Sequence, residues 1–512
     1  MQTLRELVQI ITKNKVQQIE VIGNSDHTDS MVHQFYEALV EGRFTSDEEA
    51  ADFFYQDRVN DRNYENLKYK LRRRLLNTLF FIDIKQPSYN DQQRAYYNCY
   101  KDWAAAKILL GKEARNAGIK LCQSILQKAI RYEFTELIIP ISQMLRLHYG
   151  TRVGNYKKFV HYDELFKKYE KVWQAEQLSE ELYTRLIIEY VNNKASKTDT
   201  FNKAAEYFAT LQGHMEQSDS YKLHLYGHYI NIIGSMSTND YARTISVCEA
   251  AIQFFESKAY QSKKPIQIFQ HQLLVCYTQL RQYEKGKAVA EKSLLHLDNG
   301  SFNWFKHQEL VLLLSMHTEQ YQQAYTILAE VKKHKRFRFI ATNIIELWKI
   351  YEAYMHYLIA IEEVSANDSA ITARKFKLGK FLNEVPTFSK DKRGMNIPIL
   401  IIQSLFLIVH KKYNQAIDRI EAVEKYCNRY LKKNHNYRSN CFIKMLLQIP
   451  ISGFHKAAVI RRADKYLKML ESTPLEVANQ PHEIEIIPYE QLWAFALNSL
   501  EYKRYQKRSN RS

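Results

Sequence analysis

The chain has 512 residues, of which 46% are hydrophobic and 25% charged, as in an ordinary globular protein. Only 14 glycines and nine prolines occur, which excludes a fold built on many tight turns and favours long helices with short connections. Lysine and arginine exceed the acidic residues by 73 − 56 = 17, a balance that favours an anionic partner such as nucleic acid, an anionic membrane or an acidic protein.

Two features of the chain bear on its compartment. The six cysteines form neither a CxxC pair nor a zinc cluster, which is typical of buried thiols in a reducing compartment. The first residues carry no secretory signal pattern. The most apolar run, residues 397–409, is short for a membrane span and predicts a buried helix. The sequence therefore predicts a cytoplasmic protein without a membrane-spanning segment.

Residues 1–95 are predicted to form an N-terminal helical head. Amphipathic helices are expected within 31–44, 45–55 and 60–84. One apolar stripe follows the third helix: Leu67, Leu71, Leu75, Leu79 and Ile82. Cations lie around the rest of that helix and form a candidate patch for an anionic partner: Lys68, Lys70, Arg72, Arg73 and Arg74. The head either seals the first repeat of the array that follows or is a helix-turn-helix-like module that binds nucleic acid.

Residues 96–475 contain a repeated pattern, in which an aromatic residue after a turn is followed three positions later by a small residue. The five clearest copies are Tyr283…Gly286, Tyr321…Ala324, Tyr413…Ala416, Phe201…Ala204 and Phe454…Ala457, and weaker copies begin at Ala114, Tyr156 and Tyr241. Most gaps are near 42 residues, and the gap of 413 − 321 = 92 predicts a degenerate repeat near 340–390, with helices over 344–361 and 372–385.

An apolar helical run precedes the repeated pattern and another follows it, so each unit is predicted to be a helix pair. The fold class is all-α, an α-solenoid of about eight to nine helix pairs. Residues 476–512 are predicted to add a C-terminal helix and a basic tail.

The unit over residues 270–300 resembles the tetratricopeptide repeat family. Its first helix has Leu273 and Tyr277, and Tyr283 follows the turn. The compact positions of its second helix are Gly286, Ala290 and Ser293. We expect Gly286 to permit close approach between the two helices of this repeat.

The resemblance to the tetratricopeptide repeat implies a partner-binding groove on the concave face of the first helices. Its expected positions near the best units are His271, Val275, Thr278, Lys306, Glu309 and Leu313. The expected occupant is a peptide or helix of another protein.

No motif for catalysis or for a cofactor is found, because glycine-rich phosphate loops, GxSxG and HExxH are all absent from the sequence. His224 and His228 have spacing compatible with a metal, but packing is preferred, since no further ligand accompanies them. Asp163 and Glu164 are expected to serve a helix dipole. An aromatic series is expected to fill helix contacts rather than stack on bases: Trp348, Tyr351, Tyr354 and Tyr357.

The sequence therefore predicts a non-enzymatic scaffold or adaptor that needs no cofactor and no metal and binds a protein or peptide. The alternative is a transcriptional or other nucleic-acid-binding regulator, in which the basic head contacts nucleic acid and the repeats act as a sensor. An enzyme ranks third, because no nucleophile with a base and no metal set is found.

Overall fold

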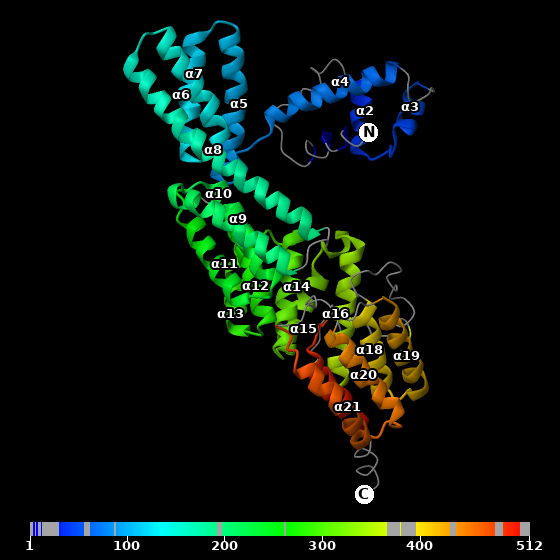
Figure 1. The fold of residues 1–512 in the computed structure, drawn as a ribbon. Helices are drawn as coiled ribbons and strands as arrows, with labels where there is room; N and C mark the ends of the chain where they lie inside the picture. The colour runs from blue at the N-terminus through cyan, green and yellow to red at the C-terminus, as the bar shows by residue number, and fades with distance from the viewer. Residues whose placement is uncertain are drawn as a thin grey trace. The chain divides into compact units, whose positions relative to one another are not determined.

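The computed structural model describes residues 4–5, 7–8, 12, 30–55, 62–86, 89–191, 197–260, 263–365, 379, 396–430, 437–476 and 485–501. Within these residues the protein is all-α, with twenty α-helices and two short 3₁₀ helices (Figure 1). Helices pack mainly against their neighbours along the chain, which confirms the predicted all-α solenoid. No helix of the described residues is long and apolar enough to cross a membrane.

The chain divides into two compact units, Met1–Gln174 with Ala259–Gln261 and Ala175–Lys258 with Ser262–Ser512. The helices of the first unit are α2 (Met31–Val40), α3 (Asp47–Tyr55), α4 (Arg62–Thr78), η1 (Leu79–Phe81), α5 (Asp91–Gly111), α6 (Arg115–Arg131), α7 (Thr135–Thr151) and the first part of α8 (Tyr156–Val191). The three helices predicted for the head are confirmed as α2, α3 and α4. They share one hydrophobic core, and helices α5 to α8 have a separate one.

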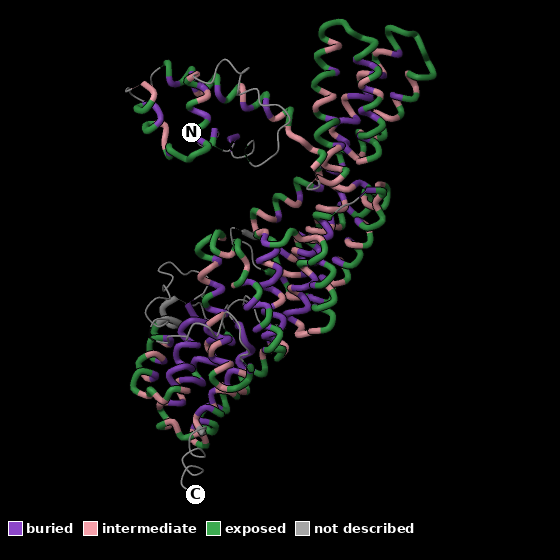
Figure 2. The backbone as a smooth tube through the Cα atoms, turned by 180° about the vertical axis from the view of Figure 1, so that it is seen from behind, coloured by how far each residue is buried: buried purple, intermediate pink, exposed green. Residues whose placement is uncertain are grey.

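The second unit begins within α8 and holds most of the repeats. Its further helices are α9 (Lys197–Gln217), α10 (Tyr221–Ser237), α11 (Tyr241–Glu256), α12 (Lys263–Gln279), α13 (Tyr283–Leu294), α14 (Phe302–His317), α15 (Tyr321–Lys333), η2 (Phe337–Phe339), α16 (Thr342–Ala360), α18 (Asn396–Val409), α19 (Tyr413–Tyr430), α20 (Tyr437–Ile451), α21 (Lys456–Glu471) and α22 (Tyr489–Glu501). Its largest core extends from α14 to α22, where buried positions are dense in Figure 2.

One turn geometry accounts for the repeated pattern. The repeat tyrosine is the first residue of a helix at positions 156, 241, 283, 321 and 413. Two residues before each of them, the chain adopts positive φ, at Gly154, Asn239, Arg281, Glu319 and Lys411. In the last four of these turns the next amide donates to the carbonyl five residues back, as Gln282 does to Tyr277 at 2.9 Å, whereas the amide of Asn155 donates six residues back, to Tyr149. This bond satisfies a carbonyl at the end of the first helix and reverses the chain within a few residues.

The degenerate repeat predicted near 340–390 begins with α16. Glu362 has positive φ, and the amide of Glu363 donates to the carbonyl of Leu358 at 3.0 Å, as in the other turns. The first predicted helix, over 344–361, is therefore confirmed. The second, over 372–385, lies outside the described residues apart from Gly379, which is helical.

Three copies of the pattern have a different register from the predicted one. In the regular turn the buried small position follows the positive-φ residue by five, as Gly286 follows Arg281. The positive-φ residues Glu113 and Phe454 therefore place this position at Gly118 and Val459, which are both buried. Ala117 and Ala457, the predicted small residues, are exposed. The Phe201 copy begins inside α9 rather than at its first residue, although Ala204 is buried as expected.

Gly286 lies where two helices approach α13 closely. A Cβ added there would meet Leu314 Cδ2 of α14 at 2.6 Å and Tyr277 Cβ of α12 at 3.3 Å. The predicted approach within one repeat therefore exists, but the closer neighbour belongs to the next repeat. Leu314 is fully buried, so it has little freedom to move aside.

Substitutions at Gly286 are expected to destabilise the second unit. We expect Gly286→Ala to lower the free energy of unfolding by about 1 kcal/mol and Gly286→Leu by about 3 kcal/mol, because overpacking exceeds the gain in helix propensity. The matched control is Gly213→Ala in α9, where an added Cβ meets nothing within 4 Å. That variant should gain about 0.5–1 kcal/mol. Urea unfolding followed by circular dichroism measures both, and an equal response at the two glycines would contradict the contact.

Several predictions about burial are confirmed. The aromatic series on α16 is buried within helix contacts, with exposures of 1% or less at Trp348, Tyr351, Tyr354 and Tyr357. The apolar run over 397–409 forms α18, which is almost wholly buried. Five cysteines are buried free thiols, and the side chain of Cys427 lies outside the described residues.

Candidate partner-binding surface

Three tyrosines gather on helices α8 and α10 of the second unit. The ring centroid of Tyr183 lies 5.2 Å from that of Tyr226 and 5.5 Å from that of Tyr229. The ring of Tyr229 also lies 5.5 Å from that of Phe269 on α12. All three tyrosines are half-buried, so part of each ring remains available to a partner.

Helix α12 continues this surface. Ile268 is 48% exposed, His271 is exposed and Val275 is half-buried, and their spacing places them on one face of the helix. We call the combined surface the aromatic strip, which consists of Tyr183, Tyr226, Tyr229, Ile268, His271 and Val275. His271 and Val275 belong to the predicted groove, whereas the other four residues were not anticipated.

The repeat period could have predicted two of the four unanticipated residues, Tyr226 and Tyr229. Subtracting 42 from the α12 positions gives 268 − 42 = 226 and 271 − 42 = 229, which are the two tyrosines of α10. Equivalent positions of successive repeats are lined up by stacking. The predicted groove positions belong to the best-matching units, α12 and α14, and those units do not include α10.

Three of the predicted groove residues are buried inside the array. Thr278 donates its hydroxyl to the carbonyl of Leu274 at 2.8 Å, and Leu313 is part of the largest core. Glu309 is 2% exposed and accepts hydrogen bonds from Lys306 at 2.9 Å and from the hydroxyl of Tyr351 at 3.2 Å. Lys306 itself is half-buried. Of the predicted positions on α14, only Lys306 keeps substantial exposure.

The C-terminal segment covers part of α14 and the turn after it. The imidazole Nε2 of His317 lies 2.6 Å from the carbonyl oxygen of Glu485. The hydroxyl of Tyr321 donates to Gln491 at 2.9 Å, and its ring contacts Phe495. Helix α22 also packs against α18, α20 and α21. The aromatic strip on α8, α10 and α12 therefore offers the more accessible first-helix surface.

An ion pair fixes the beginning of the C-terminal segment. Arg438 and Glu485 are both fully buried, with Nη2 to Oε1 at 2.6 Å and Nε to Oε2 at 3.0 Å. Nη2 of Arg438 also donates to Glu490 at 2.7 Å, and Nη1 donates to the Thr473 carbonyl at 2.8 Å. Burial raises the pKa of Glu485, and the hydrogen bonds from Arg438 oppose this.

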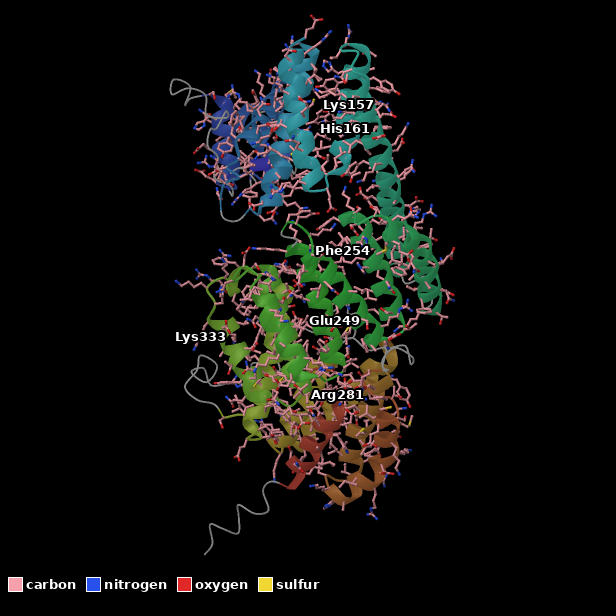
Figure 3. All side chains as sticks on the ribbon, turned by 90° about the vertical axis from the view of Figure 1, so that its left-hand side faces the viewer. Lys157, His161, Glu249, Phe254, Arg281 and Lys333 are labelled. Atoms are coloured by element: carbon pink, nitrogen blue, oxygen red, sulfur yellow. The ribbon has the colours of Figure 1, made fainter. Side chains whose placement is uncertain are left out.

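The histidine pair on α10 is held by packing. The ring of His224 stacks on Phe254 at 3.9 Å, and its Nε2 lies 3.0 Å from the Ser218 carbonyl. His228 meets the ring of Phe269 edge-on. Phe254 is labelled on α11 in Figure 3. Among the residues that the structure describes, no third His, Cys, Asp or Glu joins the pair to form a metal site.

The expectation that Asp163 and Glu164 serve a helix dipole is wrong. Helix α8 begins at Tyr156, so both residues lie in its third turn, beyond the range of the dipole at the N-terminus, and Asp163 has other partners. Its carboxylate forms ion pairs with Arg146 and Lys167, each at 2.8 Å.

The predicted cation patch of the head divides into two parts. Lys68 is half-buried and bonds to Asp47 at 2.9 Å and to Glu65 at 3.0 Å. Lys70, Arg72 and Arg73 are exposed, and Arg74 is half-buried. Lys68 thus contributes to the fold of the head, and the exposed cations remain available for an anionic partner.

No protein-family model matches the chain, and no curated protein or solved structure matches it.

Proposed function

We propose that the protein is a non-enzymatic adaptor, similar to tetratricopeptide repeat proteins, that binds a peptide segment of a partner protein along the aromatic strip. The observation that carries this proposal is the presence of partly exposed aromatic and apolar side chains at equivalent positions of α10 and α12. Tyrosines in such positions provide much contact area at low conformational cost and are enriched in binding hot spots.

The repeat that contains α12 and α13 supports the likeness to the tetratricopeptide family. Five of its six motif residues are buried, as residues that join helices must be: Leu273, Tyr277, Gly286, Ala290 and Ser293. The sixth, Tyr283, is half-buried. The strip residues of the same repeat are exposed or half-buried. The motif residues thus supply the packing, and the strip residues supply the binding surface.

A cation on α12 favours an acidic residue in the partner segment. Lys264 is exposed and precedes Ile268 by one turn of this helix. A segment with apolar residues for the strip and a carboxylate for Lys264 has the complementary chemistry.

The test compares variants that alter exposed positions of the strip. Ile268→Asp combined with Tyr226→Ser should weaken partner binding at least tenfold, because it removes two apolar contacts and adds a charge opposite an acidic segment. The control is Gln253→Ser on α11, an exposed position outside the strip. Partner proteins are first captured from the native cell with wild type, control and strip variant. Those that wild type and control capture, but the strip variant does not, are purified, and calorimetry measures their Kd for each protein.

Folding is checked by circular dichroism and thermal melting of each variant. A purified partner that binds the strip variant as tightly as wild type, while both melt alike, would overturn the assignment of the strip.

A further inference from the structure

The outward face of α4 in the head carries an unusual set of side chains. Positions 66, 69, 70, 72, 73 and 77 are exposed and carry Asn66, Tyr69, Lys70, Arg72, Arg73 and Asn77. The opposite face is buried in the core of the head and carries Tyr64, Leu67, Leu71, Leu75 and Thr78. Glu65 and Leu76 are also exposed, so the helix presents cations, amides and one tyrosine to solvent with one acid and one leucine among them.

Helix α4 is fixed to the helix before it. The hydroxyl of Tyr64 donates to Asp47 Oδ1 at 2.8 Å, and Lys68 Nζ lies 2.9 Å from the same oxygen. Asp47 is the first residue of α3, so these bonds hold the N-terminal half of α4 against the start of α3. A helix held in this way has a defined outward face, which a binding surface requires.

The exposed cations of α4 have no carboxylate partner within the part of the chain that the structure describes. Lys70, Arg72 and Arg73 form no ion pair with any described residue, whereas Lys68 in the same helix forms two. Three unneutralised charges within four residues, in a chain of net charge +17, produce a local positive potential.

We propose that the outward face of α4 binds double-stranded DNA by lying in its major groove. The groove admits one α-helix, and arginine and asparagine form bidentate hydrogen bonds with guanine and adenine edges. Asn66, Lys70, Arg73 and Asn77 recur at three or four residues, so they follow one side of the helix. Arg72 and Tyr69 flank that line and reach the phosphates and sugars.

Duplex DNA explains this face better than a membrane does. A helix that lies on a bilayer inserts an apolar stripe, but the main apolar stripe of α4 is already used in the core of the head, which leaves Tyr69 and Leu76 as the exposed large apolar side chains of this helix. The exposed amides of Asn66 and Asn77 would be costly against acyl chains, whereas base edges satisfy them. An anionic membrane would use the charges without the amides, and the deep, narrow major groove of duplex RNA does not admit side chains that read bases.

The test uses the full chain and a fluorescein-labelled mixed-sequence duplex of about 30 base pairs, with binding followed by anisotropy. We expect a log–log salt slope of roughly −2.7 if three phosphates are neutralised, so a change from 50 to 200 mM NaCl weakens binding about 40-fold. The variant Lys70→Gln, Arg72→Gln, Arg73→Gln should lose most of this binding.

A charge-matched control distinguishes DNA binding by the outward face of α4 from an effect of the protein's net charge. Lys285→Gln, Lys287→Gln, Lys292→Gln removes the same charge from exposed positions of α13 and should leave DNA binding unchanged. Equal losses in the two triple variants would overturn the proposal, as would the absence of any anisotropy change at 50 mM NaCl. Asn66→Ala combined with Asn77→Ala should change the preference among duplex sequences while circular dichroism stays unchanged.

Competing ligands complete the experiment. The competitors are a single-stranded oligonucleotide, an RNA duplex and vesicles containing 30% phosphatidylserine. If the protein binds any of them as tightly as the DNA duplex, the major-groove assignment is overturned. The strip variant Ile268→Asp with Tyr226→Ser should bind the duplex like wild type. The two proposals therefore fail independently of each other.

Discussion

Replacing Arg438 with methionine is expected to lower the free energy of unfolding of the C-terminal repeats by about 3–5 kcal/mol. The side chain is fully buried and donates to Glu485, Glu490 and two backbone carbonyls. Its loss leaves the fully buried carboxylate of Glu485 without its cation. Hydrogen exchange measured at α18, α20 and α22 should show faster opening in the variant, because these helices pack together.

A double variant distinguishes loss of the charge pair from loss of side-chain volume. Arg438→Met with Glu485→Gln should be less destabilised than Arg438→Met alone, because no unpaired charge remains buried. The surface control is Lys468→Met, whose partner Asp464 is exposed, and it should leave the free energy of unfolding almost unchanged. Equal protection of α22 in Arg438→Met and wild type would contradict the buried pair.

The helix pairs could be predicted because each repeat uses the same local chemistry. The turn before Tyr283, Tyr321 or Tyr413 depends on a few consecutive residues, so its pattern is visible in the sequence. For the copy at Phe454, the pattern predicts the small position two residues before the observed one, because Gly453 and Phe454 both adopt positive φ and lengthen the turn. The buried small position is then filled by Val459, which the aromatic-x-x-small pattern does not describe.

The repeat pattern could not predict that the C-terminal segment covers part of α14. His317 and Tyr321 meet Glu485 and Gln491 across more than 160 residues, and such contacts have no periodic signature. The resemblance to the tetratricopeptide repeat implied that Glu309 lines the groove, where an acid is expected to be exposed. Its bonds from Lys306 and Tyr351 allow it to be buried instead. The repeat period thus specifies which helix lines a face, but not which residues the chain later covers.

Acid is expected to destabilise the second unit through two histidines, the half-buried His228 and the buried His307. Burial, followed by the charge of His224, lowers the pKa of His228 to about 4. Burial, followed by the charge of His271, lowers the pKa of His307 to about 4. In the unfolded chain a histidine has a pKa near 6.5, so below that pH the unfolded state binds more protons than the native state. Stability is complete above about pH 7 and falls as the pH decreases towards 4.

The expected loss is about 2 kcal/mol per histidine at pH 5 relative to pH 7.5, since each pKa unit corresponds to about 1.4 kcal/mol. Urea unfolding at several pH values gives the proton uptake. His228→Asn and His307→Asn should each reduce this uptake by about one proton between pH 6 and pH 5, whatever they do to stability at pH 7.5. His161→Asn is the control, because His161 is exposed on α8 (Figure 3). An unchanged proton uptake in both the His228 and the His307 variant would show that these side chains are already charged in the native state, and that α10 and α14 accommodate an imidazolium.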